Sequence, residues 1–326
     1  MADIFKLVSA LLVIAIHTDL KLIIQNPFLV SILDFFESMA VPFFFCTTGF
    51  MLQREIDASH KIKAEVINRY LCKYIRSYTV LSVMYLPLTL YGEYLQYVKS
   101  GNLLKIAVGV IKNYILVGQQ FYSWQLWYLL SVIFALVVLK RIASTNQNIC
   151  VWCTGSFILA YCVNLLSNTK IITHTVGNGR ILTGLTYISL GMIVYQKKNL
   201  FKKVHSFIII GILLAVSLIM NISYSTTNII IFIVMPWILA LVMRVSSFNP
   251  PCFSKWCRKM SIMVYYLHMY FLFFWHYILQ NEKKNVACFI FVSCMSGLFS
   301  IVYCIMKDKR IRDVLKEKEY DLPDSE

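Results

Sequence analysis

The chain has 326 residues, of which 59% are hydrophobic and only 14% are charged. A soluble domain carries about 25% charged residues, so this composition, with a mean hydropathy of +0.67, excludes both a soluble domain and a disordered chain. The net charge of +15 would indicate nucleic-acid binding in a soluble domain, but in a membrane protein it is typical of loops that set orientation. We therefore expect an all-α, polytopic integral membrane protein with the lipid bilayer, and no nucleic acid, as its partner.

The apolar segments predict about ten transmembrane helices, since one helical span needs about 20 apolar residues. We treat residues 1–306 as one transmembrane domain and residues 307–326 as a short charged cytoplasmic tail. No soluble catalytic domain fits between the spans, so any chemistry must come from the spans and their loops. The predicted spans cover 4–24, 28–52, 77–97, 124–142, 148–166, 179–196, 204–221, 226–247, 261–279 and 286–306.

The basic residues alternate between the gaps that separate these spans. If the N-terminus is cytoplasmic, the inner gaps and the tail hold 22 Lys and Arg residues, the outer gaps hold 8, and Lys6 completes the total of 31. Cytoplasmic loops of membrane proteins carry such an excess. We therefore predict that both termini are cytoplasmic and that the protein resides in the cell membrane. Of the two longest gaps, 53–76 is expected to form a basic helix at the cytoplasmic surface and 98–123 an amphipathic external segment.

The first span carries two ionisable side chains on one helical stripe. Lys6 and His17 are eleven residues apart, which brings them to within about 20° of each other around the helix and about 16 Å apart along it. Ala10 and Val13 lie between them on the same stripe. His17 is either a proton-transfer group or a core histidine bonded to a neighbour, and Lys6 is either functional or a lysine that reaches the membrane surface.

The second span carries Asp34 and Glu37, one turn apart on one face and at a depth like that of His17. A carboxylate that holds the imidazole of His17 would fix its tautomer and raise its basicity. The alternative is that both carboxylates are solvated in a wet outer vestibule.

Three further features of the chain offer charged or titratable groups. Arg69, Lys73 and Arg76 share one helical face at the predicted cytoplasmic surface, where they would contact either lipid head groups or a phosphate ligand. Arg180 opens the sixth span as an interface anchor or an anion clamp. His268 lies near the middle of the ninth span. The cysteines show no spacing with the ligand count of a zinc site, so we expect no metal and no disulfide framework.

Taken in order, several segments resemble acyltransferase family 3, the integral membrane acyltransferases that modify extracytoplasmic glycans. The family's first span carries a basic residue, ten intervening residues and a His, which here are Lys6 and His17. Its other motifs have counterparts in "VPFFFCTTGFML" (Val41–Leu52), "NRYLCKYIRSY", the W-Y-L at Trp127–Leu129, "GNGRILTGLTYISLGMIVY" (Gly177–Tyr195), and the S-x-x-x-Y-x-x-H of Ser261, Tyr265 and His268.

The chain departs from the family pattern at three places. Lys6 stands where the family usually has Arg, Thr48 stands where Ser is usual, and the Arg that often precedes the V-P pair is missing from the stretch 37–40. The chain is also similar to the membrane half of serine racemases of the vancomycin-resistance type, which handle D-serine, although it contains no counterpart of their soluble racemase domain.

The resemblance implies a membrane O-acyltransferase, most directly an O-acetyltransferase, that uses acetyl-CoA from the cytoplasm and a glycan hydroxyl outside. We expect the protein to hold no bound cofactor. His17 would be the base or transient acyl carrier, supported by Asp34 and Glu37. The roles of the remaining residues would be donor binding by Lys6, Arg69, Lys73 and Arg76, and substrate positioning by Arg180, His268 and Trp127. Two alternatives stay open: a transporter of a small polar solute with His17 as a proton relay, and a non-catalytic partner in an exopolysaccharide machine.

Overall fold

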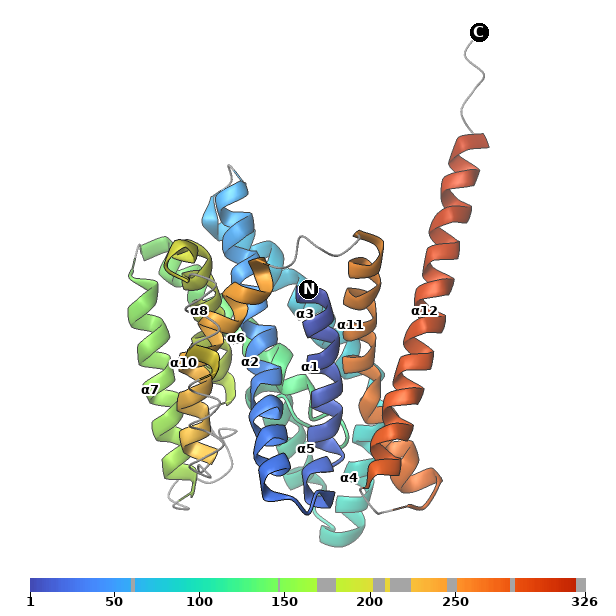
Figure 1. The fold of residues 1–326 in the computed structure, drawn as a ribbon. Helices are drawn as coiled ribbons and strands as arrows, with labels where there is room; N and C mark the ends of the chain where they lie inside the picture. The colour runs from blue at the N-terminus through green and yellow to red at the C-terminus, as the bar shows by residue number, and fades with distance from the viewer. Residues whose placement is uncertain are drawn as a thin grey trace. The chain divides into compact units, whose positions relative to one another are not determined.

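The computed structural model describes residues 1–59, 62–145, 147–168, 180–201, 209–211, 224–244, 251–281 and 285–320. Every regular element in these ranges is a helix, and they contain no strand, which confirms the all-α class (Figure 1). The chain divides into two compact units, and each is described by itself. One unit combines Met1–Leu20 with Phe248–Glu326, and the other comprises Lys21–Ser247.

Five of the described helices are long and apolar enough to cross a membrane. They fall on five of the ten predicted spans and make the protein a multi-pass membrane protein. The predicted span 204–221 lies almost entirely outside the described residues. The five apolar stretches are Pro27–Ala58, Leu126–Thr145, Ile149–Leu166, Thr227–Arg244 and Val286–Lys307.

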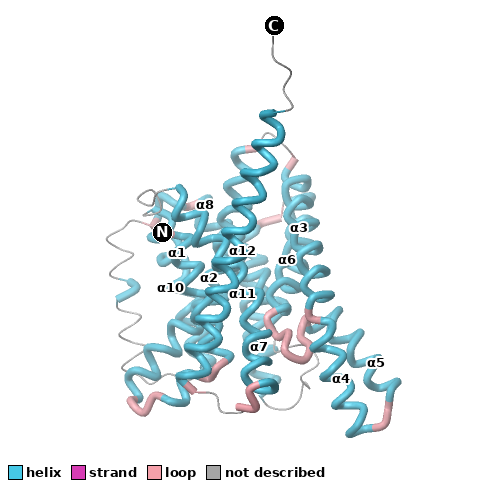
Figure 2. Tube along the Cα trace, turned by 90° about the vertical axis from the view of Figure 1, so that its right-hand side faces the viewer, coloured by secondary structure: helices cyan, strands magenta, loops and turns pink. Residues whose placement is uncertain are grey.

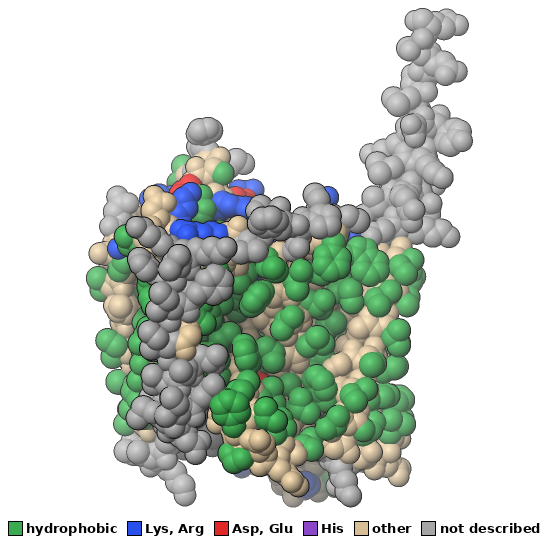
Figure 3. Space-filling model, viewed as in Figure 1, with side chains coloured by type: hydrophobic (Ala, Val, Ile, Leu, Met, Phe, Trp, Pro, Cys, Tyr) green, Lys and Arg blue, Asp and Glu red, His purple; other side chains and the backbone are tan. Residues whose placement is uncertain are grey.

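The exterior of the helices is apolar, as lipid contact requires. Figure 3 shows hydrophobic side chains over most of the face in view, with Lys and Arg side chains gathered where α2 (Pro27–Ala58) ends and α3 (Lys63–Met84) begins. Exposed apolar residues on this scale would be a liability in water but are expected of helices that face hydrocarbon.

The first unit contains α1 (Ala2–His17), α11 (Pro251–Phe273) and α12 (Val286–Tyr320). α11 packs against both α1 and α12, and α1 and α11 lie side by side with their N-termini at the same end (Figure 1). A π-helical segment, η6 (Phe274–Ile278), extends α11. α12 continues past residue 306, where the predicted span ends.

In the second unit, α2 and α8 (Arg180–Gln196) pack with their backbones in contact. A Cβ on Gly49 would lie 1.9 Å from the carbonyl oxygen of Ile188, and a Cβ on Gly191 would lie 2.0 Å from that of Cys46. Only glycine fits at either position, which is the small-residue packing common between membrane helices.

α8 is the central helix of this unit. It packs against α2, α6 (Leu126–Thr145), α7 (Ile149–Asn168) and α10 (Tyr224–Arg244). Neighbours on all sides bury its middle, which explains why the sequence of α8 is apolar around its whole circumference.

The predicted span 77–97 is divided between two helices. α3 runs from the predicted interfacial segment to Met84, and α4 (Leu86–Ser100) starts after Tyr85 with Pro87 in its first turn. Proline has no N–H and fits a first turn better than a helix interior, so the chain breaks there. α5 (Leu103–Lys112) then lies beside α4 (Figure 2) and is followed by a π-helical segment, η2 (Asn113–Val117).

Candidate functional site

Two histidines from opposite ends of the sequence stack on each other in the first unit. The rings of His17, the last residue of α1, and His268 of α11 have centroids 5.3 Å apart and planes inclined by 24°. His268 is fully buried, and the ring of Tyr265 lies 5.9 Å from it. The structure therefore brings together two residues that sequence reasoning had assigned to separate roles.

The hydrogen bonding of His268 favours one tautomer. Its Nδ1 lies 3.3 Å from the carbonyl oxygen of Val264. A carbonyl oxygen only accepts, so this contact places the proton on Nδ1 and leaves the lone pair on Nε2. Nε2 is buried and has no hydrogen-bond partner among the described residues. A buried imidazole with an unused lone pair is suited to accept a proton or a hydroxyl hydrogen bond from a substrate.

The other end of α1 carries an ionic cluster centred on Asp3. Its carboxylate accepts a hydrogen bond from the Ser254 hydroxyl and pairs with Arg258 at 3.2 Å and with Lys6 at 3.9 Å. Lys6 therefore lies in the first turns of α1, at the end of the helix opposite His17. Sequence reasoning gave no role to Arg258, which brings a guanidinium group to the carboxylate that Lys6 also contacts.

The middle of the α1 stripe is buried. Ala10 is 0% exposed and Val13 is 3% exposed. The two ionisable residues of the stripe are therefore separated by a packed apolar surface.

Asp34 and Glu37 lie on α2, in the second unit. Asp34 accepts a hydrogen bond from Lys21 at 2.8 Å, while Glu37 is only 5% exposed. His17 belongs to the first unit, so contact between either carboxylate and its imidazole stays a prediction.

The three predicted donor-binding cations on α3 lie on its exposed surface. Arg69 pairs with Glu55 at 2.9 Å, and Arg69, Lys73 and Arg76 are all exposed. Tyr70, which precedes the apolar part of α3, also bonds to Glu55; burial and then this hydrogen bond raise its pKa above the ordinary value. Their roles at a phosphate ligand stay predictions.

Arg180 and Trp127 lie together in the second unit. The guanidinium carbon of Arg180 is 5.5 Å from the centroid of the Trp127 ring, a cation–π distance. The Ser131 hydroxyl contacts the carbonyls of Arg180 and Ile181 at 3.0 and 2.9 Å and accepts from the Gly184 N–H at 2.9 Å. These contacts hold the start of α8 against α6 and so position Arg180.

Comparison with known families agrees with this arrangement of motifs. The model of acyltransferase family 3, described as an acyltransferase domain, matches residues 2–305. The chain belongs to this family. Because the match spans nearly the whole chain, this acyltransferase domain includes both histidines and both of the units described above.

A curated relative of this chain is an amino-acid racemase from Enterococcus faecalis. The two are 30% identical over 124 residues, which is 38% of this chain and 16% of the racemase. The chain thus spans about a sixth of the length of this relative. No solved structure matches the chain significantly.

Thr48, which follows the V-P pair, takes part in a hydrogen-bond chain that links α2, α3 and α6. The Thr48 hydroxyl donates to the carbonyl of Phe44 at 3.0 Å and lies 3.2 Å from the hydroxyl of Tyr74 on α3. Tyr74 in turn bonds to Tyr128 of the W-Y-L motif on α6. Thr48 therefore keeps the hydroxyl that serine supplies elsewhere in the family, and the V-P and W-Y-L motifs meet through it.

Several of the described cysteines are buried between helices, whereas others are exposed. The thiol of Cys153 donates to the carbonyl of Thr186, and Cys257 is buried. Over the described ranges, no group of three His, Cys, Asp or Glu side chains is placed to hold a metal ion. The side chain of Cys252 lies outside the described residues.

The first unit places a buried imidazole at one end of α1 and positive charge at the other. Neither the histidine stack nor the place of Arg258 could be read from the sequence, because each depends on how α11 packs against α1. The available signal was motif order, since the S-x-x-x-Y-x-x-H motif also ends in a histidine.

Proposed function

We propose that the protein is a membrane O-acyltransferase, most directly an O-acetyltransferase, which moves an acyl group from cytoplasmic acyl-CoA to a hydroxyl of an extracytoplasmic glycan. The observation that carries the proposal is the stacked pair of His17 and His268 in a chain of acyltransferase family 3. Transfer to a hydroxyl requires a base or a nucleophilic carrier, and imidazole serves in either role.

The direct form of the reaction uses the histidine pair as the base. The imidazole takes the proton of the acceptor hydroxyl while the hydroxyl oxygen bonds to the acyl carbonyl carbon. The bond from that carbon to the CoA sulfur then breaks, and the proton passes to the leaving thiolate. In the alternative form His17 itself carries the acyl group between two such steps.

The proposed topology has ten spans, both termini in the cytoplasm and a location in the cell membrane. The parallel packing of α1 and α11 supports it, because the first and ninth spans of a ten-span chain run in the same direction. In the second unit, Lys140 donates to Asn68 and Arg244 donates to the carbonyl of Lys198. Each of these contacts joins two segments that the charge distribution places on the cytoplasmic side.

The charged end of the donor is proposed to bind at the cytoplasmic end of α1, the helix that carries His17. Lys6 and Arg258 lie at the predicted cytoplasmic end, about 16 Å along the helix from His17. They would attract the charged end of acyl-CoA, with Arg69, Lys73 and Arg76 as further cations on the same side. Arg180 over Trp127, at the predicted outer end of α8, would position the acceptor.

Replacement of His17 tests the catalytic role. A strain that lacks the gene would be complemented with wild-type protein or with His17→Ala, and base-labile acetate would be released from the surface glycan and quantified. We expect the variant to insert normally and to lose at least 10²-fold in transfer rate, the usual contribution of a general base. If the variant inserts normally and releases as much acetate as wild type, His17 has only a structural role.

A second candidate function, export of a small polar solute such as an amino acid, is favoured by the match to the amino-acid racemase. Mass analysis of the surface glycan separates the two, since only an acyltransferase leaves an ester that disappears with the gene. Uptake or release of labelled serine by vesicles that contain the purified protein would support the transporter instead.

A further inference from the structure

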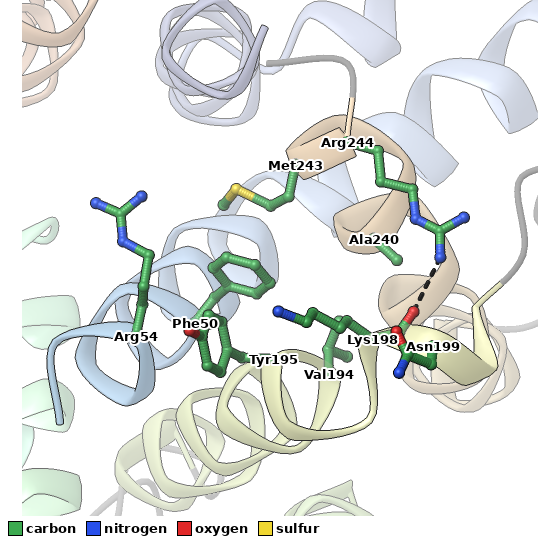
Figure 4. Close-up of a pocket in the computed structure, with 9 residues that line it drawn as sticks. All are labelled: Phe50, Arg54, Val194, Tyr195, Lys198, Asn199, Ala240, Met243 and Arg244. Atoms are coloured by element: carbon green, nitrogen blue, oxygen red, sulfur yellow. Dashed lines mark hydrogen bonds between the residues drawn. The ribbon is translucent and has the colours of Figure 1, made fainter. Parts of the chain in front are cut away.

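The second unit contains a pocket of about 380 Å³ that none of the proposed roles uses. It lies where α2, the end of α8, the short helix η4 (Lys198–Leu200) and α10 meet (Figure 4). Its lining residues are Phe50, Arg54, Val194, Tyr195, Lys198, Asn199, Ala240, Met243 and Arg244.

Three cations surround this pocket, and each comes from a different segment of the chain. Arg54 belongs to α2, Lys198 to η4 and Arg244 to α10. The Arg244 guanidinium donates to the carbonyl of Lys198 at 2.9 Å, which fixes the two segments together. Figure 4 shows the Lys198 side chain reaching across the pocket, and its ammonium nitrogen lies 5.3 Å from the centroid of the Tyr195 ring.

Among the described residues, no carboxylate pairs with the three positive charges of the pocket. None of the lining residues is acidic, and the ion pairs found among the described residues involve none of the three cations. By contrast, Arg69 on α3 already pairs with Glu55. Figure 4 shows the Arg54 and Arg244 guanidinium groups at opposite ends of the lining residues, with the Lys198 ammonium between them. A charge that only sets membrane orientation needs to lie on the correct side and need not line a hollow beside aromatic rings.

We propose that this pocket binds the phosphate group of a ligand. The guanidinium groups of Arg54 and Arg244, one at each end of the lining, each offer N–H donors that match phosphate oxygens, and the Lys198 ammonium adds a third positive charge. The rings of Phe50 and Tyr195, with centroids 5.1 Å apart, give the same pocket an apolar wall. In the proposed topology the pocket opens at the cytoplasmic side, so the phosphate belongs either to a soluble phosphate ester or to an anionic lipid head group.

The inference does not depend on acyl transfer, and its test needs no turnover. The full-length protein would be purified in neutral detergent, and binding of adenosine 3′,5′-bisphosphate would be measured by calorimetry at low salt. Lys198→Gln combined with Arg244→Gln removes two charges from exposed positions, so the fold should survive. Arg141→Gln is the matched control, because Arg141 is exposed, belongs to a predicted cytoplasmic loop of the same unit and does not line the pocket.

We expect the double variant to weaken bisphosphate binding at least tenfold, since two charge-assisted hydrogen bonds are lost, and the control to stay within about twofold of wild type. Lys198→Arg should bind as wild type does. A second arm measures retention of phosphatidylglycerol by native mass spectrometry after reconstitution in mixed phosphatidylglycerol and phosphatidylcholine nanodiscs.

Each outcome bears on the phosphate site. Loss of bisphosphate binding in the double variant identifies a soluble phosphate ester as the ligand class. Loss of phosphatidylglycerol retention alone identifies the lipid head group as the source of the phosphate. If the double variant matches Arg141→Gln in both arms, the pocket is not a phosphate site, whatever the result of the His17 experiment.

Discussion

His17 and His268 are separated by most of the sequence, yet their rings stack within the first unit. The nearby His276 lies in the π-helical extension of α11. The Nε2 atom of His268 is buried and has no hydrogen-bond partner in the part of the chain described. The measured ring stack with His17 makes His268 the histidine to test first.

We predict that His268→Ala lowers acyl transfer by about 10²- to 10⁴-fold, because it removes either the base or the ring that orients the base. His276→Ala, a change of the same size in the same segment, should leave the rate within a few fold of wild type. Base-labile acetate on the surface glycan measures both. Equal activity in the two variants would assign His268 to packing.

Lys6 and Arg258 both pair with the carboxylate of Asp3, which partly neutralises their positive charges. Lys6→Met should raise the KM for acetyl-CoA more than it lowers kcat, which is the pattern of lost ground-state binding. Lys6→Arg should be tolerated or should improve binding, because it supplies the family's guanidinium and its paired donors. Initial rates in proteoliposomes at varied acetyl-CoA give both constants. A fall in kcat alone would contradict a role in donor binding.

At the residue scale, the sequence predicted features that depend only on the geometry of a single helix. The 100° helical period placed Lys6 and His17 on one stripe, and the burial of Ala10 and Val13 confirms that this stripe is packed. The helical period could not predict that Arg69 pairs with Glu55, because that contact depends on how α3 lies against α2.

At the scale of elements, apolar runs located α8 and α6 to within a few residues, since polar residues bound them on both sides. The same method overlooked the junction at Tyr85. The apolar residues continue through it, and only Pro87 marks the break. Proline has no backbone N–H, and its absence breaks a helix. An average of hydropathy over many residues does not register this single change.

The contact of α2 with α8 gives a prediction about stability. Gly191→Ala places a methyl group 2.0 Å from the carbonyl oxygen of Cys46, so the helices must separate. We expect a cost of about 1–3 kcal/mol and a lower Tm in detergent, as overpacking typically causes. Gly155→Ala on α7 is the control, because its Cβ would meet nothing within 4 Å. Equal melting temperatures would show that the backbone contact is not tight.

At the scale of the whole molecule, motif order and composition were sufficient to predict the family and the all-α class, and both are confirmed. The pairing of helices was not predictable from them. α1 packs on α11 across more than 200 residues of sequence, and hydropathy contains no information about which apolar face meets which. The pocket around Lys198 was hidden for the same reason, since its cations come from α2, η4 and α10, which are far apart in sequence.

The orientation of the whole chain yields the last prediction. The excess of basic residues in alternate gaps predicts that reporters fused after Arg76 and after Phe201 are cytoplasmic and that one fused after Lys112 is external. The contacts of Lys140 with Asn68 and of Arg244 with Lys198 agree with this alternation, because each joins two gaps assigned to the same side. Paired alkaline phosphatase and fluorescent protein fusions at the three sites would measure it, since each reporter is active on only one side of the membrane. A cytoplasmic signal after Lys112 would reverse or break the alternation between the second and fourth predicted spans. A broken alternation, unlike a reversed one, would also assign Arg54 to the side opposite Lys198 and Arg244, whereas the pocket requires a common side.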